Sequence, residues 1–142
     1  MLTLYHAPKA RSFRTLWLLE EIGSPYEIKT VSIRRGDGSG TRDSANPHPH
    51  GKVPALVHNG ALIYETTAIA LYLTDAFPDA HLGPKVGEAD RGAYLTWLSY
   101  YSGVFEPSLT AKFLPESDIF KNYVARLTAR PAFSRALAKD AG

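Results

Sequence analysis

The sequence contains no cysteine, a single methionine and no long apolar run. Without cysteine there is no disulfide, no thiolate nucleophile, no zinc finger and no iron–sulfur cluster. Any thiol chemistry therefore uses a thiol that another molecule supplies. No stretch approaches the ~18 consecutive apolar residues of a membrane helix, and the N-terminal residues lack the pattern of a secretory signal. We therefore expect a cytoplasmic protein with no membrane partner.

Charge of neither sign dominates the chain. Its 142 residues include 16 Lys and Arg against 14 Asp and Glu, for a net charge of +2. This balance lacks the clustered basic excess of nucleic-acid-binding proteins, so we expect no nucleic-acid partner. His48, His50 and His58 have neither a carboxylate cluster nor helical spacing to support them, so we expect no metal. A hydrophobic content of 44% is typical of a folded globular protein.

The first half of the chain combines strand and helix patterns. Residues 2–6 alternate apolar and polar side chains, and residues 12–22 carry apolar side chains at helical spacing before Gly23 and Pro25. A second strand is expected at 26–33, before a long irregular loop that ends at Gly51. Strands at 55–58 and 61–64 then flank Asn59-Gly60, a strong hairpin signal, and residues 65–77 form an amphipathic helix. The expected order is therefore β-α-β-loop-β-β-α.

The second half is predicted to be helical. Residues 78–87 look like a linker, and a helix is expected over 88–105 that Pro107 ends. One face of that helix carries Arg91, Tyr94, Leu95, Leu98, Tyr101 and Phe105. Ser117 is expected to cap a last helix with Ile119, Phe120, Tyr123, Val124 and Leu127 facing inward. Pro131 either starts a further helical turn or kinks that helix.

Val53 and Pro54 stand between the irregular loop and the following strand. If their peptide bond is cis, it belongs to a tight turn that lets the backbone of Val53 pair with an extended peptide ligand. The alternative is a trans proline that begins an edge strand.

Glu65 and Thr66 stand where a helix begins directly after a strand. The first turn of a helix offers unpaired N–H groups to a carboxylate, and the Thr66 hydroxyl adds a further donor. Glu65 can pair with an ammonium of the same ligand, so the two residues suit the α-amino acid end of a peptide. The alternative is an ordinary helix cap.

Taken in order, four segments of the chain resemble the glutathione S-transferase family. They are Leu4-Tyr5-His6-Ala7-Pro8, Trp17 to Glu27, Asn46 to Leu56 and Tyr64 to Leu73. The resemblance spans most of the chain. It implies an α/β thioredoxin-like domain with a mixed four-stranded sheet at 1–78, a linker at 79–87 and a shortened all-α domain at 88–142.

The resemblance also implies a ligand and the residues that hold it. Glutathione is the implied co-substrate, with no metal and with a homodimer as the usual assembly. Val53 would pair its backbone with the cysteinyl part of glutathione, next to a cis Pro54. Glu65 and Thr66 would hold the γ-glutamyl end, and Lys52 would touch the tripeptide.

Members of the family activate the glutathione thiol with Tyr, Ser or Cys near the end of the first strand or the start of the first helix. We place Ser12 first, because a hydroxyl donor at a helix start lowers a thiol pKa. Arg11 would add positive charge, and Tyr5 is the second choice. The alternative interpretation makes Ser12 only a helix cap.

The expected function is that of a glutathione S-transferase-like enzyme acting on a small electrophile. Its substrate pocket would be lined by Tyr94, Trp97, Tyr101 and Phe105. The alternative is a non-catalytic glutathione-binding or protein-interaction module on the same fold. The stretch between Phe105 and Tyr123 is shorter than in the family, which indicates either a reduced member or an absent segment.

Overall fold

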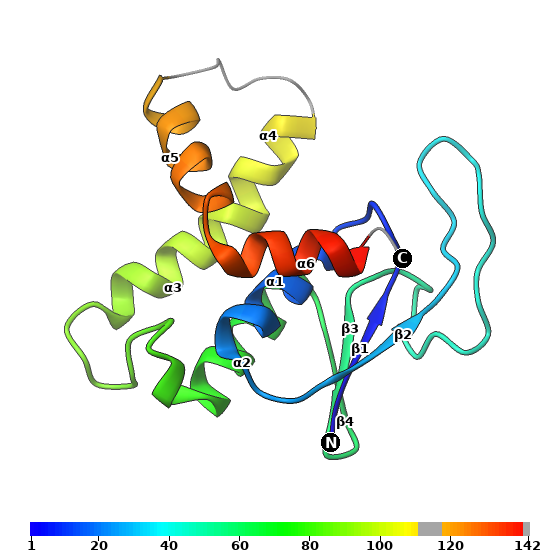
Figure 1. Cartoon of the computed structure of the whole chain (residues 1–142), viewed down its shortest axis with the longest axis horizontal. Coiled ribbons are helices and arrows are strands. Elements are labelled where there is room, and N and C mark those ends of the chain that lie inside the picture. The colour runs from blue at the N-terminus through cyan, green and yellow to red at the C-terminus, as the bar shows by residue number, and fades with distance from the viewer. Residues whose placement is uncertain (111–117, 141–142) are drawn as a thin grey trace.

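The computed structural model describes residues 1–110 and 118–140 (Figure 1). The first half contains β1 (Leu2–His6), α1 (Ser12–Ile22), β2 (Glu27–Thr30), β3 (Ala55–His58), β4 (Ala61–Tyr64) and α2 (Thr66–Ala76). The predicted order is confirmed. Strand β2 is shorter than the predicted 26–33, although Val31 still donates its N–H to the carbonyl of His6 at 2.8 Å.

The four strands form one mixed sheet with the order β2-β1-β3-β4. Strand β1 runs parallel to β2 and antiparallel to β3, and β3 runs antiparallel to β4. The sheet agrees with the predicted fold class. Strand β1 is central, so its two neighbours place Lys29 and Ala55 on either side of Tyr5.

The hairpin between β3 and β4 turns at the predicted Asn59-Gly60. Asn59 has φ of 50° and Gly60 has φ of 85°, both in the left-handed region. A two-residue hairpin turn that matches the strand twist requires this conformation at both positions, and Asn and Gly adopt it at low cost.

The main core lies where α1 and α2 pack against the sheet and against each other, and where α1 packs against helix α6 (Pro131–Asp140). Its buried members are Leu2, Leu4, Leu16, Leu19, Leu56, Ile69, Leu73 and Ala136. The C-terminal helix thus supplies a residue to the core of the first half. Figure 1 shows α6 lying across α1.

The second half begins with a 3-10 turn at Pro78–Ala80 and continues with α3 (Arg91–Tyr100), a π-helical turn (Tyr101–Phe105) and α4 (Glu106–Thr110). The prediction that Pro107 ends this helix was wrong, because Pro107 lies inside α4. In the π-helical turn, the N–H of Glu106 donates to the carbonyl of Tyr101. This π-helical turn ends two residues before Pro107, which has no N–H to donate, and the helix continues through the proline.

Helix α3 buries none of its residues, so its apolar and aromatic side chains are not part of the core. Leu95 is 38% exposed, and Arg91 pairs instead with Asp75 of α2 at 2.7 Å. Helix α3 packs against α2 and the π-helical turn.

Helix α5 (Asp118–Thr128) precedes α6, which begins at Pro131 as the first of the two alternatives predicted. The predicted cap Ser117 and the side chains of Ile119, Phe120 and Tyr123 lie outside the described residues. Leu127 is half-buried, but Val124 is 39% exposed, so its predicted inward position was wrong. Helix α5 packs against α6, and this contact leaves Val124 uncovered among the described residues.

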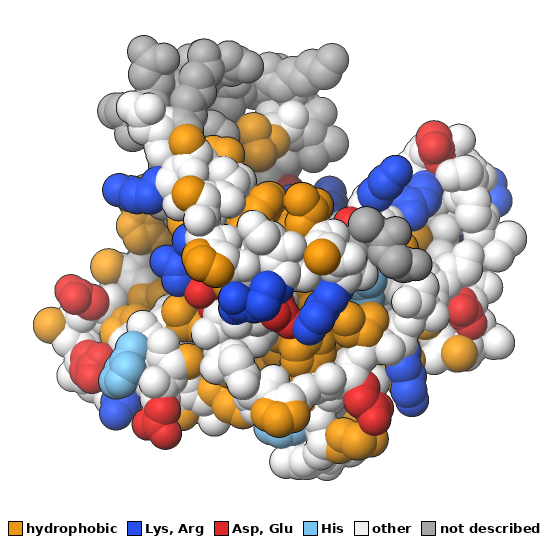
Figure 2. Space-filling view, in the orientation of Figure 1, with side chains coloured by type: hydrophobic (Ala, Val, Ile, Leu, Met, Phe, Trp, Pro, Cys, Tyr) orange, Lys and Arg blue, Asp and Glu red, His pale blue; other side chains and the backbone are white. Residues whose placement is uncertain are grey.

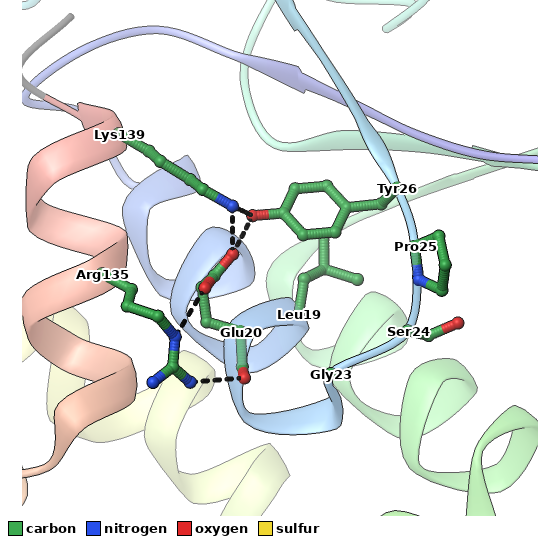
Figure 3. Close-up of a pocket in the computed structure, with 8 residues that line it drawn as sticks. All are labelled: Leu19, Glu20, Gly23, Ser24, Pro25, Tyr26, Arg135 and Lys139. Atoms are coloured by element: carbon green, nitrogen blue, oxygen red, sulfur yellow. Dashed lines mark hydrogen bonds and ion pairs between the residues drawn. The ribbon is translucent and has the colours of Figure 1, made fainter.

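A polar cluster fastens α6 to α1 (Figure 3). The Glu20 carboxylate accepts hydrogen bonds from Arg135 at 2.9 Å, from Lys139 and from the hydroxyl of Tyr26. Arg130 pairs with Glu21 in the same way. Figure 2 shows basic side chains gathered near the centre of this face, with acidic side chains beside them. Among the described helices, none is long and apolar enough to cross a bilayer.

Candidate functional site

A cavity of about 400 Å³ opens where the start of α1, the cis-proline turn, the start of α2 and α4 meet. Its volume is within the range of small-molecule sites. Its lining consists of Arg11, His48, Lys52, Val53, Pro54, Glu65, Thr66, Thr67, Ser102 and Glu106. The five residues that the resemblance assigns to glutathione binding, Lys52, Val53, Pro54, Glu65 and Thr66, are all among them. The fold thus brings together two sequence segments that the β3–β4 hairpin separates.

The turn at one wall of the cavity contains a cis Val53–Pro54 peptide bond, the first of the two predicted alternatives. Asn46 is buried behind it and holds its shape. The Asn46 side-chain amide donates to the Lys52 carbonyl at 3.0 Å, while its oxygen accepts the N–H of His48 at 3.0 Å. One side chain therefore fixes the backbone at His48 and at Lys52, where the irregular loop ends.

The opposite wall is the junction of β4 and α2. Glu65 occupies the helix cap position with φ of 71°, a conformation that costs a non-glycine residue energy and clusters at functional sites. Its side chain makes no capping hydrogen bond, so the ordinary helix-cap interpretation is not supported. Thr66 is the first residue of α2, where backbone N–H groups point outward.

A cluster of opposite charges forms the third side of the cavity. The carboxylate of Glu106, on α4, lies 3.0 Å from Nε of Arg11 and 2.7 Å from a terminal nitrogen of Arg14. The side chain of Arg11 is 60% exposed, while that of Glu106 is 14% exposed. The carboxylate therefore holds Arg11 in place while leaving much of its guanidinium accessible to a ligand.

The structure places Ser12 away from the cavity. It is completely buried, and its Oγ lies 2.9 Å from Nδ1 of His6 and accepts the N–H of Ala7 at 3.2 Å. Ser12 is the first residue of α1 and makes no side-chain capping bond, so it is not the helix cap either. Tyr5 is half-buried against the cluster of Ala7, Val31 and Val53.

Beside the cavity lies a smaller apolar crevice of about 200 Å³, which shares Thr66 and Thr67 with it. Tyr101 lines this crevice together with Leu18 and Leu98, and Phe105 packs on Tyr101.

The other two aromatic residues predicted for a substrate pocket lie elsewhere. The hydroxyl of Tyr94 lies 2.7 Å from that of Thr74, and Trp97 is 69% exposed. The four predicted pocket residues therefore separate into Tyr101 and Phe105 at the crevice, and Tyr94 and Trp97 away from it.

Four cavity residues, His48, Thr67, Ser102 and Glu106, are absent from the sequence-based assignment. His48 was considered only as a metal ligand, and in the described residues no three His, Asp or Glu side chains form a group that could hold a metal. Burial lowers the pKa of His48 and outweighs the negative charge of Glu65, which acts to raise that pKa. The imidazole is therefore neutral at pH 7. Ser102 and Glu106 lie on the second half, and no sequence signal links them to the cavity.

Comparison with known proteins agrees with this geometry. The family model described as the N-terminal domain of glutathione S-transferase matches residues 1–75. Glutathione S-transferase 3 of Schizosaccharomyces pombe is 28% identical over 99% of this chain, and glutathione S-transferase GstA of Escherichia coli O157:H7 is 30% identical over 80%. The chain spans 59% and 57% of the lengths of these two relatives.

Solved structures show the same fold. A sphingomonad glutathione S-transferase in complex with glutathione superposes with a TM-score of 0.80 at 23% identity, over 98% of both chains. A glutathione transferase from Methylococcus capsulatus superposes with a TM-score of 0.66 at 29% identity, over 98% of this chain and 67% of its own. The matched family model, the shared fold and the cis-proline cavity lead to one conclusion: the chain belongs to the glutathione S-transferase family.

Proposed function

We propose that this chain binds glutathione in the 400 Å³ cavity and activates its thiol for attack on a small electrophile. The observation that carries the proposal is the convergence of Val53, Glu65 and Thr66 on that cavity, beside an arginine that faces it. The backbone of Val53 pairs with the cysteinyl part of the tripeptide, as an added strand would. Glu65 and the first turn of α2 bind the ammonium and carboxylate of the γ-glutamyl end.

Arg11 is the group that we propose to stabilise the thiolate. A cation beside a thiol favours the deprotonated form and lowers its pKa. The thiol proton passes to solvent, the thiolate sulfur forms a bond with the electrophilic carbon, and the leaving group departs with its electron pair. Ser12 is buried and does not line the cavity, so it does not contact the sulfur in this mechanism.

The apolar crevice beside the cavity suits the apolar part of the electrophile. Leu18, Leu98 and Tyr101 line it, and the guanidinium of Arg14 lies 5.2 Å from the centre of the Tyr101 ring. This arrangement favours a small aromatic or aliphatic acceptor, and Arg14 at the crevice favours one with an acidic substituent.

A homodimer in the cytoplasm is the assembly that we propose for the chain. Exposed apolar side chains on the second half, including Trp97, Tyr100 and Val104, offer surface for a second copy. Light scattering that gives twice the mass of 15.6 kDa supports this assembly, and the monomer mass contradicts it.

Calorimetric titration with glutathione tests the proposed function. Saturable binding is expected for the unmodified chain, together with turnover of an activated aryl halide. Arg11→Ala is expected to retain binding and lose turnover by about 10- to 100-fold. Arg91→Ala, which removes another helix-start arginine that pairs with a carboxylate, is the matched control. Binding without turnover supports the alternative binding module, and absence of binding at millimolar glutathione contradicts both readings.

A further inference from the structure

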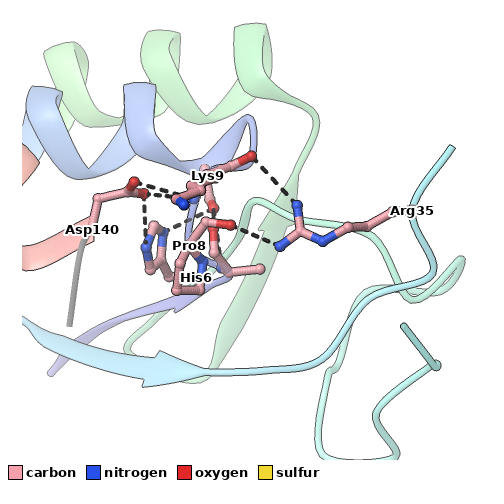
Figure 4. A network of polar contacts seen from close by, with 7 residues as sticks. His6, Pro8, Lys9, Arg35 and Asp140 are labelled. Atoms are coloured by element: carbon pink, nitrogen blue, oxygen red, sulfur yellow. Dashed lines mark hydrogen bonds and ion pairs between the residues drawn. The ribbon is translucent and has the colours of Figure 1, made fainter. Parts of the chain in front are cut away.

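The turn between β1 and α1, residues 7–11, is held by groups far from it in sequence (Figure 4). The carboxylate of Asp140, at the end of α6, accepts the N–H of Lys9 at 3.1 and 3.3 Å. Arg35, from the irregular loop, donates to the carbonyl of Pro8 at 2.8 Å. Lys9 has φ of 55°, a left-handed conformation that persists only where surrounding structure supports it. Asp140 is the carboxylate that supports it here.

Asp140 also faces His6, a residue that is only 1% exposed. Nε2 of His6 lies 3.2 Å from Asp140 Oδ1, outside hydrogen-bond geometry, and no other described residue hydrogen-bonds to Nε2. Burial lowers the pKa of His6 and outweighs the negative charge of Asp140, which acts to raise that pKa. The ring is therefore neutral at pH 7. A lone pair on Nε2 would be repelled at this distance from a carboxylate, so the ring proton belongs on Nε2.

This choice of tautomer fixes the hydrogen bonds that follow. With the proton on Nε2, Nδ1 of His6 is an acceptor, and the hydroxyl of Ser12 donates to it across 2.9 Å, a shorter contact than the 3.3 Å from the same hydroxyl to the carbonyl of Ala7. The oxygen of Ser12 is then directed to accept the N–H of Ala7 at 3.2 Å. One carboxylate on α6 therefore determines the hydrogen bonding at the start of the turn, at Ala7, and at its middle, at Lys9.

The sequence Asp140, His6, Ser12 has the order of a hydrolytic triad, but it does not perform that chemistry here. Ser12 is 0% exposed, and its oxygen already accepts a backbone N–H. A nucleophilic serine has to reach a substrate carbonyl. The three residues instead join the C-terminal helix to the turn that leads into α1.

From this arrangement we propose that Asp140 is a positioning residue for thiol activation. It fixes the tautomer of His6 and the conformation of the turn at residues 7–11. The conformation of this turn determines the position of Arg11 in the cavity. This inference rests on the role proposed for Arg11. Asp140 does not line the cavity. The proposal therefore gives the end of α6 an indirect part in the chemistry of the bound thiol.

Asp140→Asn tests the proposal with almost no change in size. An asparagine whose amide nitrogen faces His6 puts N–H groups in place of a carboxylate beside Nε2, which favours a lone pair there and moves the ring proton to Nδ1. The Nδ1–H then points at Ser12 and turns the Ser12 hydroxyl away from the ring, so the turn is held by a different set of hydrogen bonds.

The principal readout is the pKa of the thiol of bound glutathione, followed by thiolate absorbance across pH. Asp140→Asn is expected to raise that pKa and to lower kcat by about 10-fold, with KM for glutathione changed less than about twofold. Arg11→Ala is expected to raise the same pKa. The double variant is expected to add nothing to Arg11→Ala alone, because both changes act through one group. Asp75→Asn, which breaks the α2–α3 ion pair, is the matched control and keeps the thiol pKa of the unmodified protein.

A thiol pKa unchanged in folded Asp140→Asn, or effects of the two variants that add, would overturn the proposal. If the variant fails to fold, the ¹⁵N shifts of His6 in the unmodified protein decide: a proton on Nε2 supports the proposal, and one on Nδ1 contradicts it. Failure of the proposed function has a different signature, because the unmodified chain then either binds no glutathione or binds it without turnover.

Discussion

The carboxylate of Glu106 lies 3.0 Å from Nε of Arg11, and this contact joins α4 to the turn that opens α1. Both residues line the same cavity. The second half of the chain therefore does more than cover the first, since it supplies the counter-charge that orients the cation of the candidate site.

Replacement of Glu106 by Gln is expected to lower the free energy of unfolding by about 1 kcal/mol. The carboxylate pairs with Arg11 and Arg14, but their side chains are 60% and 39% exposed, and solvent screens such pairs. Urea denaturation measures the change. Glu27→Gln on exposed β2 is the control and should leave the denaturation midpoint unchanged. A loss of several kcal/mol from Glu106→Gln would contradict the prediction, because solvent-exposed ion pairs contribute less than that to stability.

Removal of the Glu65 side chain is expected to weaken glutathione binding by roughly 10- to 100-fold. That range corresponds to the loss of a charge-assisted hydrogen bond of about 1.5 to 3 kcal/mol. Calorimetry of Glu65→Ala provides the measurement, with Glu88→Ala beyond α2 as the control. Equal affinities for the two variants would exclude Glu65 from the γ-glutamyl contact.

The hydroxyl of Thr66 gives a separate test of the same wall. Thr66→Val keeps the shape and removes the donor, so it is expected to cost about 0.5 to 1.5 kcal/mol of binding free energy. Thr66→Ser keeps the hydroxyl, and its affinity should stay close to that of the unmodified protein. If both variants bind alike, the backbone N–H groups of α2 alone hold the carboxylate.

Enlargement of Ala136 is expected to loosen the C-terminal helix. Ala136 is 0% exposed within the main core, so Ala136→Leu forces extra methylene groups into packed space and destabilises the fold by about 1–3 kcal/mol. Thermal unfolding measures the loss. Leu137→Met, at a neighbouring position that is 51% exposed, should have little effect; equal stabilities would mean that α6 does not pack as described.

Acidification is expected to weaken the cluster around Glu20. Burial alone would raise the pKa of this carboxyl, but the hydrogen bonds from Lys139, Tyr26 and Arg135 outweigh it and hold the pKa below its ordinary 4.5. Because the folded state binds its proton less readily than the unfolded state, this contribution is complete above pH ~4.5 and is lost as the pH falls through the depressed value. Stability of Glu20→Gln measured against pH should lack that part of the acid loss; a parallel curve would contradict the assignment.

Several features could be predicted because short segments determine them. Asn59-Gly60 specifies its turn through the backbone freedom of two neighbours, and the apolar spacing of residues 12–22 specifies a helix whatever lies against it. The cavity walls at Val53–Pro54 and Glu65–Thr66 are likewise pairs of adjacent residues, so their chemistry was visible in the order of the chain.

Packing between distant segments decided the rest. The sequence by itself determined the elements of the first half and the adjacent residue pairs that form two walls of the cavity, because strand, turn and helix signals act over a few residues. Only the tertiary structure decided that Ser12 is buried beside His6, that Arg11 faces Glu106 and that Asp140 closes on Lys9. Each of these contacts joins side chains whose direction depends on how whole helices pack, and no local pattern encodes that geometry.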